Sequence, residues 1–137
     1  MKTATLASIA LAISVSVANA QTIGVSMTNL DKFREMLLNG VVSHGKTISG
    51  LKLVTANAEG DNELQKKQVQ QFVADKVDAI IMMLSDGDFG PQMTKIAADA
   101  GIPLIYINTT PSNLSDLPDN QVVVASDEKD SGTLETK

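Results

Sequence analysis

The segment GIPLIYINTTPS, residues 101–112, combines a helix stop, an apolar strand and an abrupt polar end. Gly101 and Pro103 end the preceding helix, because glycine favours the left-handed conformation past a helix and proline cannot continue one. Residues 104–107 form an unbroken apolar run, which predicts a buried strand. The polar end consists of Asn108, Thr109, Thr110 and Pro111. An apolar strand that ends abruptly in polar side chains suggests that those side chains contact a binding partner at the end of the strand.

The remainder of the chain alternates between strand and helix periodicity. A strand, a helix and another strand in repeated order imply right-handed crossovers and a parallel sheet. The predicted fold class is therefore α/β, a doubly wound parallel sheet with helices on both faces. The other predicted strands are 22–27, 51–56, 78–84 and 121–126, the predicted helices are 30–45, 63–76 and 91–100, and a further helix is expected to begin within 127–137.

Short polar side chains follow every predicted strand. Ligands of open α/β sheets bind outside the carboxyl ends of the strands, so these residues are the candidates for a site. The carboxyl-end residues are Asn29, Asp31, Asn57, Asp61, Ser85, Asp86, Asp88, Asn108, Thr109, Ser126 and Asp127. Amides and carboxylates without a cationic loop suit a neutral ligand that carries many hydroxyl groups, such as a sugar.

Helix capping explains part of this set, because Asp, Asn and Ser are preferred at helix N-termini. We assign Asp61, Asp88 and Asp127 to capping. Asn108 and Thr109 end a strand with no obvious helix directly behind them, so capping does not account for them. The polar end of segment 101–112 is therefore the strongest indication of a ligand site.

The first twenty residues, MKTATLASIALAISVSVANA, have the pattern of a secretory signal peptide. Lys2 precedes an apolar stretch of small residues, and Ala18 and Ala20 form an A-x-A cleavage pattern. The apolar stretch is shorter than the roughly 20 residues that a transmembrane helix needs. We therefore expect residues 1–20 to be a signal peptide cut after Ala20, and residues 21–137 to be a partial N-terminal sugar-binding lobe in the periplasm.

Charge and composition exclude several classes of function. Removal of Lys2 with the leader leaves 10 Lys and Arg against 16 Asp and Glu, a net charge of −6. Nucleic acids and anionic membranes both require clustered cations, so neither is an expected partner. No later segment is apolar enough to span a membrane, and there is no cysteine for a disulfide, a thiolate nucleophile or a lipid anchor.

Motifs for catalysis, metals and cofactors were not found. The loop SMTNLDKF, residues 26–33, has no glycine and therefore no phosphate cradle. SDGDFG, residues 85–90, resembles a calcium loop but lacks the twelve-residue pattern with its terminal Glu. His44 is the only histidine, and the sequence places no acid or nucleophile beside it. We expect no enzyme activity, no cofactor and no metal.

Several local motifs together resemble the N-terminal part of the periplasmic sugar-binding proteins of ABC transporters, of the ribose, galactose and rhizopine or inositol type. They are TIGVSM directly after the leader, LDKF at the first helix, VDAIIMMLSD, AGIPLIYINTTPS and VVVASDEKDSG. The resemblance covers nearly all of residues 21–137. It implies the incomplete N-terminal lobe of a type I periplasmic binding protein, which takes up a monosaccharide or inositol-like polyol and hands it to a permease in the inner membrane.

The resemblance also implies site residues. The loop after the first strand supplies an acid or amide and an aromatic that lies against the sugar ring, which correspond to Asp31 and Phe33, with Asn29 as a neighbour. The end of the fourth strand supplies further contacts, which correspond to Asn108 and Thr109. Phe33 has a competing role, because it shares a helical face with Leu37 and Val41 and would pack in the core.

Two departures from the family limit what can be transferred. Met83 replaces an amide of the galactose branch and Thr109 replaces an arginine of the ribose branch, so the identity of the sugar does not follow. Family members are also considerably longer, so the second lobe and about half of the sugar contacts are not expected in these residues. The alternatives are a periplasmic sugar sensor that feeds a chemoreceptor or a histidine kinase, and a non-functional truncated fragment.

Overall fold

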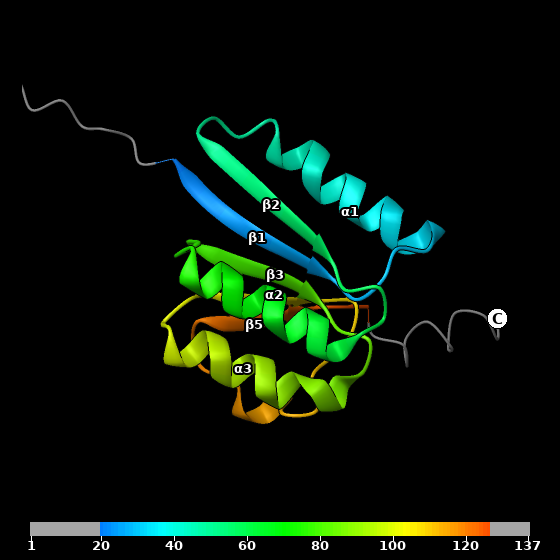
Figure 1. Ribbon diagram of the computed structural model, residues 1–137, viewed down its shortest axis with the longest axis vertical. Coiled ribbons are helices and arrows are strands. Elements are labelled where there is room, and N and C mark those ends of the chain that lie inside the picture. The colour runs from blue at the N-terminus through cyan, green and yellow to red at the C-terminus, as the bar shows by residue number, and fades with distance from the viewer. Residues whose placement is uncertain (1–19, 127–137) are drawn as a thin grey trace, which may run out of the picture.

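The computed structural model describes residues 20–126, which form a five-stranded parallel sheet with helices on both faces (Figure 1). The strand order is β2-β1-β3-β4-β5. This arrangement confirms the predicted doubly wound α/β fold. The elements are β1 (Gln21–Met27), α1 (Lys32–Gly45), β2 (Leu51–Asn57), α2 (Asn62–Ala74), β3 (Ala79–Met83), the 3-10 helix η1 (Gly87–Phe89), α3 (Gly90–Asp99), β4 (Leu104–Ile107), the 3-10 helix η2 (Leu114–Asp116) and β5 (Gln121–Val124). The predicted signal peptide and the predicted helix after residue 126 lie outside the described residues, apart from Ala20.

The helices begin where capping predicts, with one exception. Asp31 caps α1, and Asp61 caps α2 by accepting from the backbone N–H groups of Glu63 and Leu64. The assignment of Asp88 as a cap is wrong, because Asp86 caps η1 and accepts from the backbone N–H of Asp88. Asp86 has the extended backbone that an N-cap requires. Asp127, the third predicted cap, lies outside the described residues.

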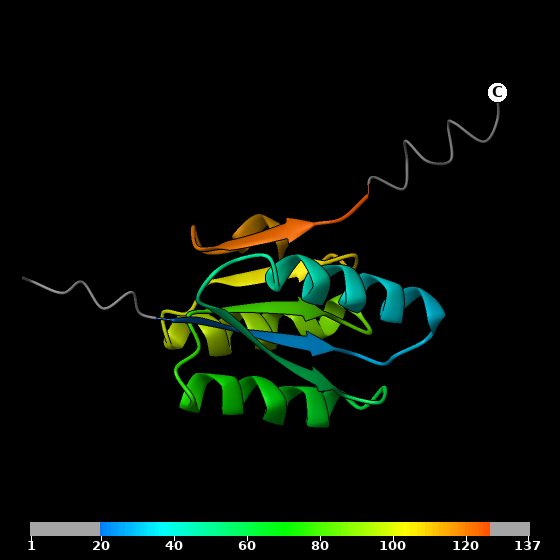
Figure 2. The same cartoon turned by 90° about the horizontal axis from the view of Figure 1, so that it is seen from above.

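Two apolar cores lie on the two faces of the sheet. Figure 2 shows α1 on one side and α2 with α3 on the other. The smaller core lies beneath α1 and is built from Val25, Met27 and Met83. The larger core lies beneath α2 and α3, and its fully buried members include Val69, Ile80, Met82, Met93, Leu104 and Tyr106.

A directional chain of hydrogen bonds holds the connection between β4 and β5 against α3. The Asn113 amide donates to Thr94 Oγ1 at 3.2 Å, Thr94 Oγ1 lies 2.8 Å from Tyr106 Oη, and Tyr106 Oη donates to the carbonyl of Gly90 at 3.0 Å. Burial raises the pKa of Tyr106, so the hydroxyl keeps the proton that it donates. The loop that follows Asn108 is therefore fixed to the sheet.

The α1 face of β5 carries exposed apolar side chains. Val122 pairs with Ile105 and Val124 pairs with Ile107, which places all four on this face. Val122 is 49% and Val124 is 62% exposed. No described helix covers this part of the sheet, so an apolar stripe is open to solvent.

We expect this stripe to make the isolated chain self-associate. Contiguous exposed apolar surface favours association, because burial removes that surface from water. The double variant Val122→Thr, Val124→Thr should shift sedimentation velocity profiles toward the monomer. Ile48→Thr is the matched control, because Ile48 is 44% exposed but lies beyond the other end of the sheet. Equal association of the two variants would contradict the prediction.

Candidate ligand site at the carboxyl edge of the sheet

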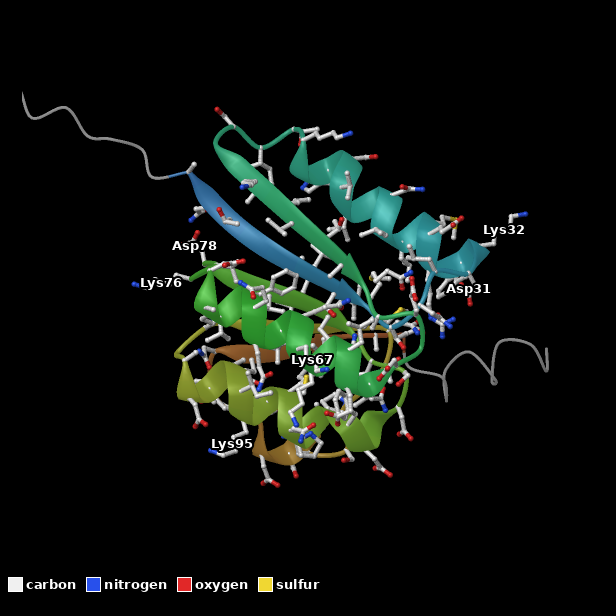
Figure 3. All side chains as sticks on the ribbon, viewed as in Figure 1. Asp31, Lys32, Lys67, Lys76, Asp78 and Lys95 are labelled. Atoms are coloured by element: carbon white, nitrogen blue, oxygen red, sulfur yellow. The ribbon has the colours of Figure 1, made fainter. Side chains whose placement is uncertain are left out.

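The topological switch point of the sheet lies between β1 and β3. These strands are neighbours, but β1 continues into α1 on one face and β3 continues through η1 into α3 on the other. This change of face is the position where open α/β sheets bind ligands. In Figure 3, Asp31 and Lys32 mark this carboxyl edge, and Lys76 and Asp78 mark the opposite edge.

Asp31, a predicted site residue, lies at this edge as the N-cap of α1. Its Oδ1 accepts from the backbone N–H of Arg34 at 2.8 Å, and its Oδ2 pairs with the Arg34 guanidinium. The backbone hydrogen bond from Arg34 is the main cause that lowers the pKa of Asp31, and the charge of Arg34 adds to it. The carboxylate is therefore charged, and Arg34 occupies one acceptor site on each of its oxygens, which leaves further acceptor sites.

We expect the negative charge of Asp31 to stabilise the fold in a pH-dependent manner. Because the pKa is lower in the folded state, its stabilisation is present above the unfolded value near 3.8 and is lost as pH falls through the folded value. Asp31→Asn keeps a capping side chain but removes the charge. Urea unfolding from pH 6 to pH 2 should show wild type more stable at the upper end, with the difference disappearing at the lower end. A difference that is independent of pH would contradict this assignment.

Asn29 offers an unused acceptor in the loop between β1 and α1. The side chain is partly buried, and its Oδ1 is buried with no hydrogen-bond partner among the described residues. An unpaired buried amide oxygen is costly, so a donor that reaches it is favoured. A ligand hydroxyl has the required chemistry.

Phe33 is not a core residue, so the competing interpretation of core packing is wrong. Its side chain is 48% exposed, whereas Leu37 and Val41 pack against the core beneath α1. Phe33 lies one turn before Leu37 on the same face of α1. The exposed aromatic therefore projects from α1 near the carboxyl edge.

A groove of about 290 Å³ connects α1 with the polar end of β4. Leu37 and Val41 line it from α1, and Ile107 and Asn108 line it from β4. The remaining lining residues, Val124, Ala125 and Ser126, come from β5 and its continuation. This groove brings Asn108 against the face of α1 that carries Phe33.

Asn108 and Thr109 are adjacent in sequence, but their side chains have different surroundings. The backbone N–H of Thr109 donates to the carbonyl of Ile107 at 2.7 Å, which closes a γ-turn around Asn108, whose φ is 64°. Asparagine is among the few residues that adopt such a conformation readily. The Asn108 side chain is exposed and makes no hydrogen bond to a described residue, whereas Thr109 Oγ1 donates to the carbonyl of Leu84 at 3.0 Å.

One buried polar side chain at this edge was missed by the sequence patterns. Gln65 is fully buried in the first turn of α2, where its Nε2 donates to the carbonyl of Met83 at 2.9 Å and to Ser26 Oγ at 3.2 Å. The helical spacing of Gln65 with Val69 and Phe72 is the signal that identifies it, since all three are buried.

Within residues 20–126 no cluster of three His, Cys, Asp or Glu side chains is placed to hold a metal ion. Over the same part of the chain, no helix has the length and hydropathy of a membrane span. His44 is exposed at the last turn of α1, where it has no neighbour for nucleophilic or acid–base chemistry among the hydrogen bonds and ion pairs of the described residues.

The fold is a doubly wound α/β lobe, and amides and a carboxylate lie at the edge where sheets of this class bind ligands. The periplasmic binding protein domain model matches residues 23–137, and the chain belongs to that family. The predicted family and fold are therefore confirmed.

Individual relatives cover nearly all of this chain. It is 48% identical over 131 residues to the "Putative rhizopine-binding protein" of Rhizobium meliloti, covering 94% of this chain and 42% of the relative. It is 26% identical to the D-galactose/methyl-galactoside binding periplasmic protein of Haemophilus influenzae. That match covers 98% of this chain and 43% of the relative. The chain thus spans less than half the length of these relatives.

A solved structure of a solute-binding protein is also similar to this chain. The solute-binding protein of an ABC transporter from Bacillus halodurans, which holds myo-inositol, superposes with a TM-score of 0.74 at 25% identity. The match covers 90% of this chain and 45% of that protein. The similarity therefore extends over the whole sheet and not only over the motifs.

Proposed function

We propose that this chain provides the N-terminal lobe of the solute-binding component of a sugar ABC transporter, which binds a monosaccharide or an inositol-like polyol in the periplasm for import. The observation that carries the proposal is the 48% identity to the Rhizobium meliloti relative across almost the entire chain. The function is binding, and it includes no chemical step. The partner is the permease of the transporter in the inner membrane.

The carboxyl edge has the chemistry that a polyol requires. Asn29 offers a buried acceptor with no partner among the described residues, and Asn108 offers both a donor and an acceptor in the exposed groove. The Asp31 carboxylate completes this polar set, because its oxygens can accept further hydrogen bonds from ligand hydroxyl groups. The half-exposed ring of Phe33 supplies an apolar surface for the C–H face of a sugar ring. We therefore propose Asn29, Asp31, Phe33 and Asn108 as ligand contacts.

We expect the isolated chain to bind only weakly. Tight binding of a small ligand requires most of its surface to be buried, and one lobe offers an open shelf. Titration of the ¹⁵N-labelled chain with myo-inositol and with D-galactose should shift the amides of residues 28–33 and 108–109 with a dissociation constant well above micromolar. A submicromolar constant would contradict the open shelf, and an absence of shifts with any polyol in a panel would contradict the proposed function.

Export is part of the proposal and has its own test. We propose that residues 1–20 direct the chain to the periplasm and that the leader is cut after Ala20. N-terminal sequencing of the protein from a periplasmic extract should begin at Gln21. Recovery of the protein with Met1 intact, or only in the cytoplasmic fraction, would overturn this assignment.

A further inference from the structure

The carboxyl end of β3 is held by side chains where its strand pairing stops. The ladder with β1 ends at the pair Met27 and Met83, and the ladder with β4 ends at the pair Met82 and Tyr106. The carbonyl of Met83 then accepts from Gln65, and the carbonyl of Leu84 accepts from Thr109. Two side chains from different elements therefore donate hydrogen bonds to the backbone at the end of the strand.

The two donors reach β3 from opposite sides. Gln65 projects from α2 and is fully buried, and its second hydrogen bond to Ser26 Oγ joins β3 to β1. Thr109 follows β4, and the γ-turn at Asn108 directs it back toward β3. Gln65 therefore links β3 to β1 at their last ladder pairs, and Thr109 links Leu84 to the end of β4 beyond the last pair of β3 with β4.

The segment held in this way borders the switch point between β1 and β3. Ser85 and Asp86 follow Leu84 directly, and both are exposed. Ser85 Oγ donates to Asn62 Oδ1 at 2.5 Å, and Asp86 caps η1. A shift of Leu84 would therefore move the polar groups that border the switch point between β1 and β3.

We propose that Gln65 and Thr109 are positioning residues, which hold residues 84–86 in place by binding the carbonyls of Met83, the last residue of β3, and of Leu84, which follows it. Thr109 acts through its hydroxyl on Leu84, and not as a primary ligand contact. The consequence for ligand binding rests on the proposed function, whereas the positioning itself is a property of the protein without ligand.

Hydrogen exchange of the ligand-free chain tests the positioning. The amides of Asp88 and Phe89 donate to Asp86, and their exchange reports on this loop. Thr109→Val and Gln65→Met remove the donors with little change in volume, and each should accelerate exchange of both amides at least tenfold relative to the amide of Ile80, which donates to Pro103 in the sheet. Thr109→Ser retains the hydroxyl and should restore the wild-type rate.

Two matched controls separate positioning from general destabilisation. Thr110→Val changes the next, exposed threonine, and Gln70→Met changes an exposed glutamine of α2. Both controls should leave the exchange ratio unchanged. If Asp88 and Phe89 accelerate only in proportion to Ile80, or if Thr109→Ser behaves like Thr109→Val, the positioning role is wrong.

Titration with myo-inositol then separates the two proposals. If wild type responds, Thr109→Val and Gln65→Met should each weaken the response at least fivefold, and Thr109→Ser should recover it. A response in wild type that neither variant weakens overturns the consequence for ligand binding. If no polyol shifts wild type while the exchange results hold, the proposed function fails and the positioning role stands.

Discussion

Replacing Phe72 by alanine is expected to lower the free energy of unfolding by about 3–5 kcal/mol, the usual loss for a large buried aromatic. Phe72 is 4% exposed and belongs to the core beneath α2 and α3. Its ring packs against Gly24 of β1, and the truncated side chain would leave a cavity between helix and sheet. Urea denaturation followed by circular dichroism measures this change.

Gly24 provides a second variant at the same contact. A Cβ atom added at Gly24 would lie 2.5 Å from Cδ2 of Phe72, so Gly24→Ala must displace the ring. In the Phe72→Ala background that obstacle is gone, and Gly24→Ala should then cost much less. The double-mutant cycle should therefore be clearly non-additive. If the losses in free energy of unfolding were additive, the Phe72 ring would not occupy the space beside Gly24.

Phe33→Ala is the matched control for Phe72→Ala. Phe33 is half-exposed, and surface substitutions usually change stability by no more than about 0.5 kcal/mol. A loss comparable to that of Phe72→Ala would mean that Phe33 packs in the core after all.

Phe33 is expected to matter for ligand affinity, although it contributes little to stability. Phe33→Ala and Asn108→Gly should each weaken myo-inositol or D-galactose binding at least tenfold, which corresponds to about 1.4 kcal/mol. Phe33→Ala removes the aromatic surface, and Asn108→Gly removes the free amide. Glycine is the suitable replacement because it retains the φ of 64°, whereas alanine would be strained there.

Amide shift titrations of the labelled chain measure this second effect, with thermal unfolding of the same samples as the stability control. Asn108→Gly should unfold like wild type and Thr110→Val should bind like wild type. Unchanged affinity in both Phe33→Ala and Asn108→Gly would remove the groove beside α1 from the ligand site. Loss of binding together with loss of stability in Asn108→Gly would instead indicate a structural role for the amide.

The sequence predicted most of the fold because its signals are local. Gly101 has a φ of 68°, as expected of the residue that ends a helix, and Pro91 lies in the first turn of α3. The apolar runs that predicted β3 and β4 are both buried in the centre of the sheet. Capping was predicted less well, because Asp86 and Asp88 lie two residues apart and only backbone geometry selects between them.

The candidate site was predicted only as a set of loops. The five site residues that the resemblance implied all lie at the carboxyl edge, since parallel strands direct their ends to one side. Their roles depended on contacts between distant segments. The Asn108 side chain makes no hydrogen bond to a described residue, whereas the Thr109 hydroxyl donates to the carbonyl of Leu84 after a γ-turn that no local sequence pattern predicts.

The sequence by itself thus determined the α/β class and the family, and it predicted the edge at which a ligand would bind, because periodicity and turn residues act within a few positions of the chain. Tertiary structure alone decided that Phe33 is open to solvent, that Gln65 is buried, and that β1 and β3 enclose the switch point. These properties depend on which helix covers which strand. Packing between segments far apart in sequence sets that arrangement, and no single segment encodes it.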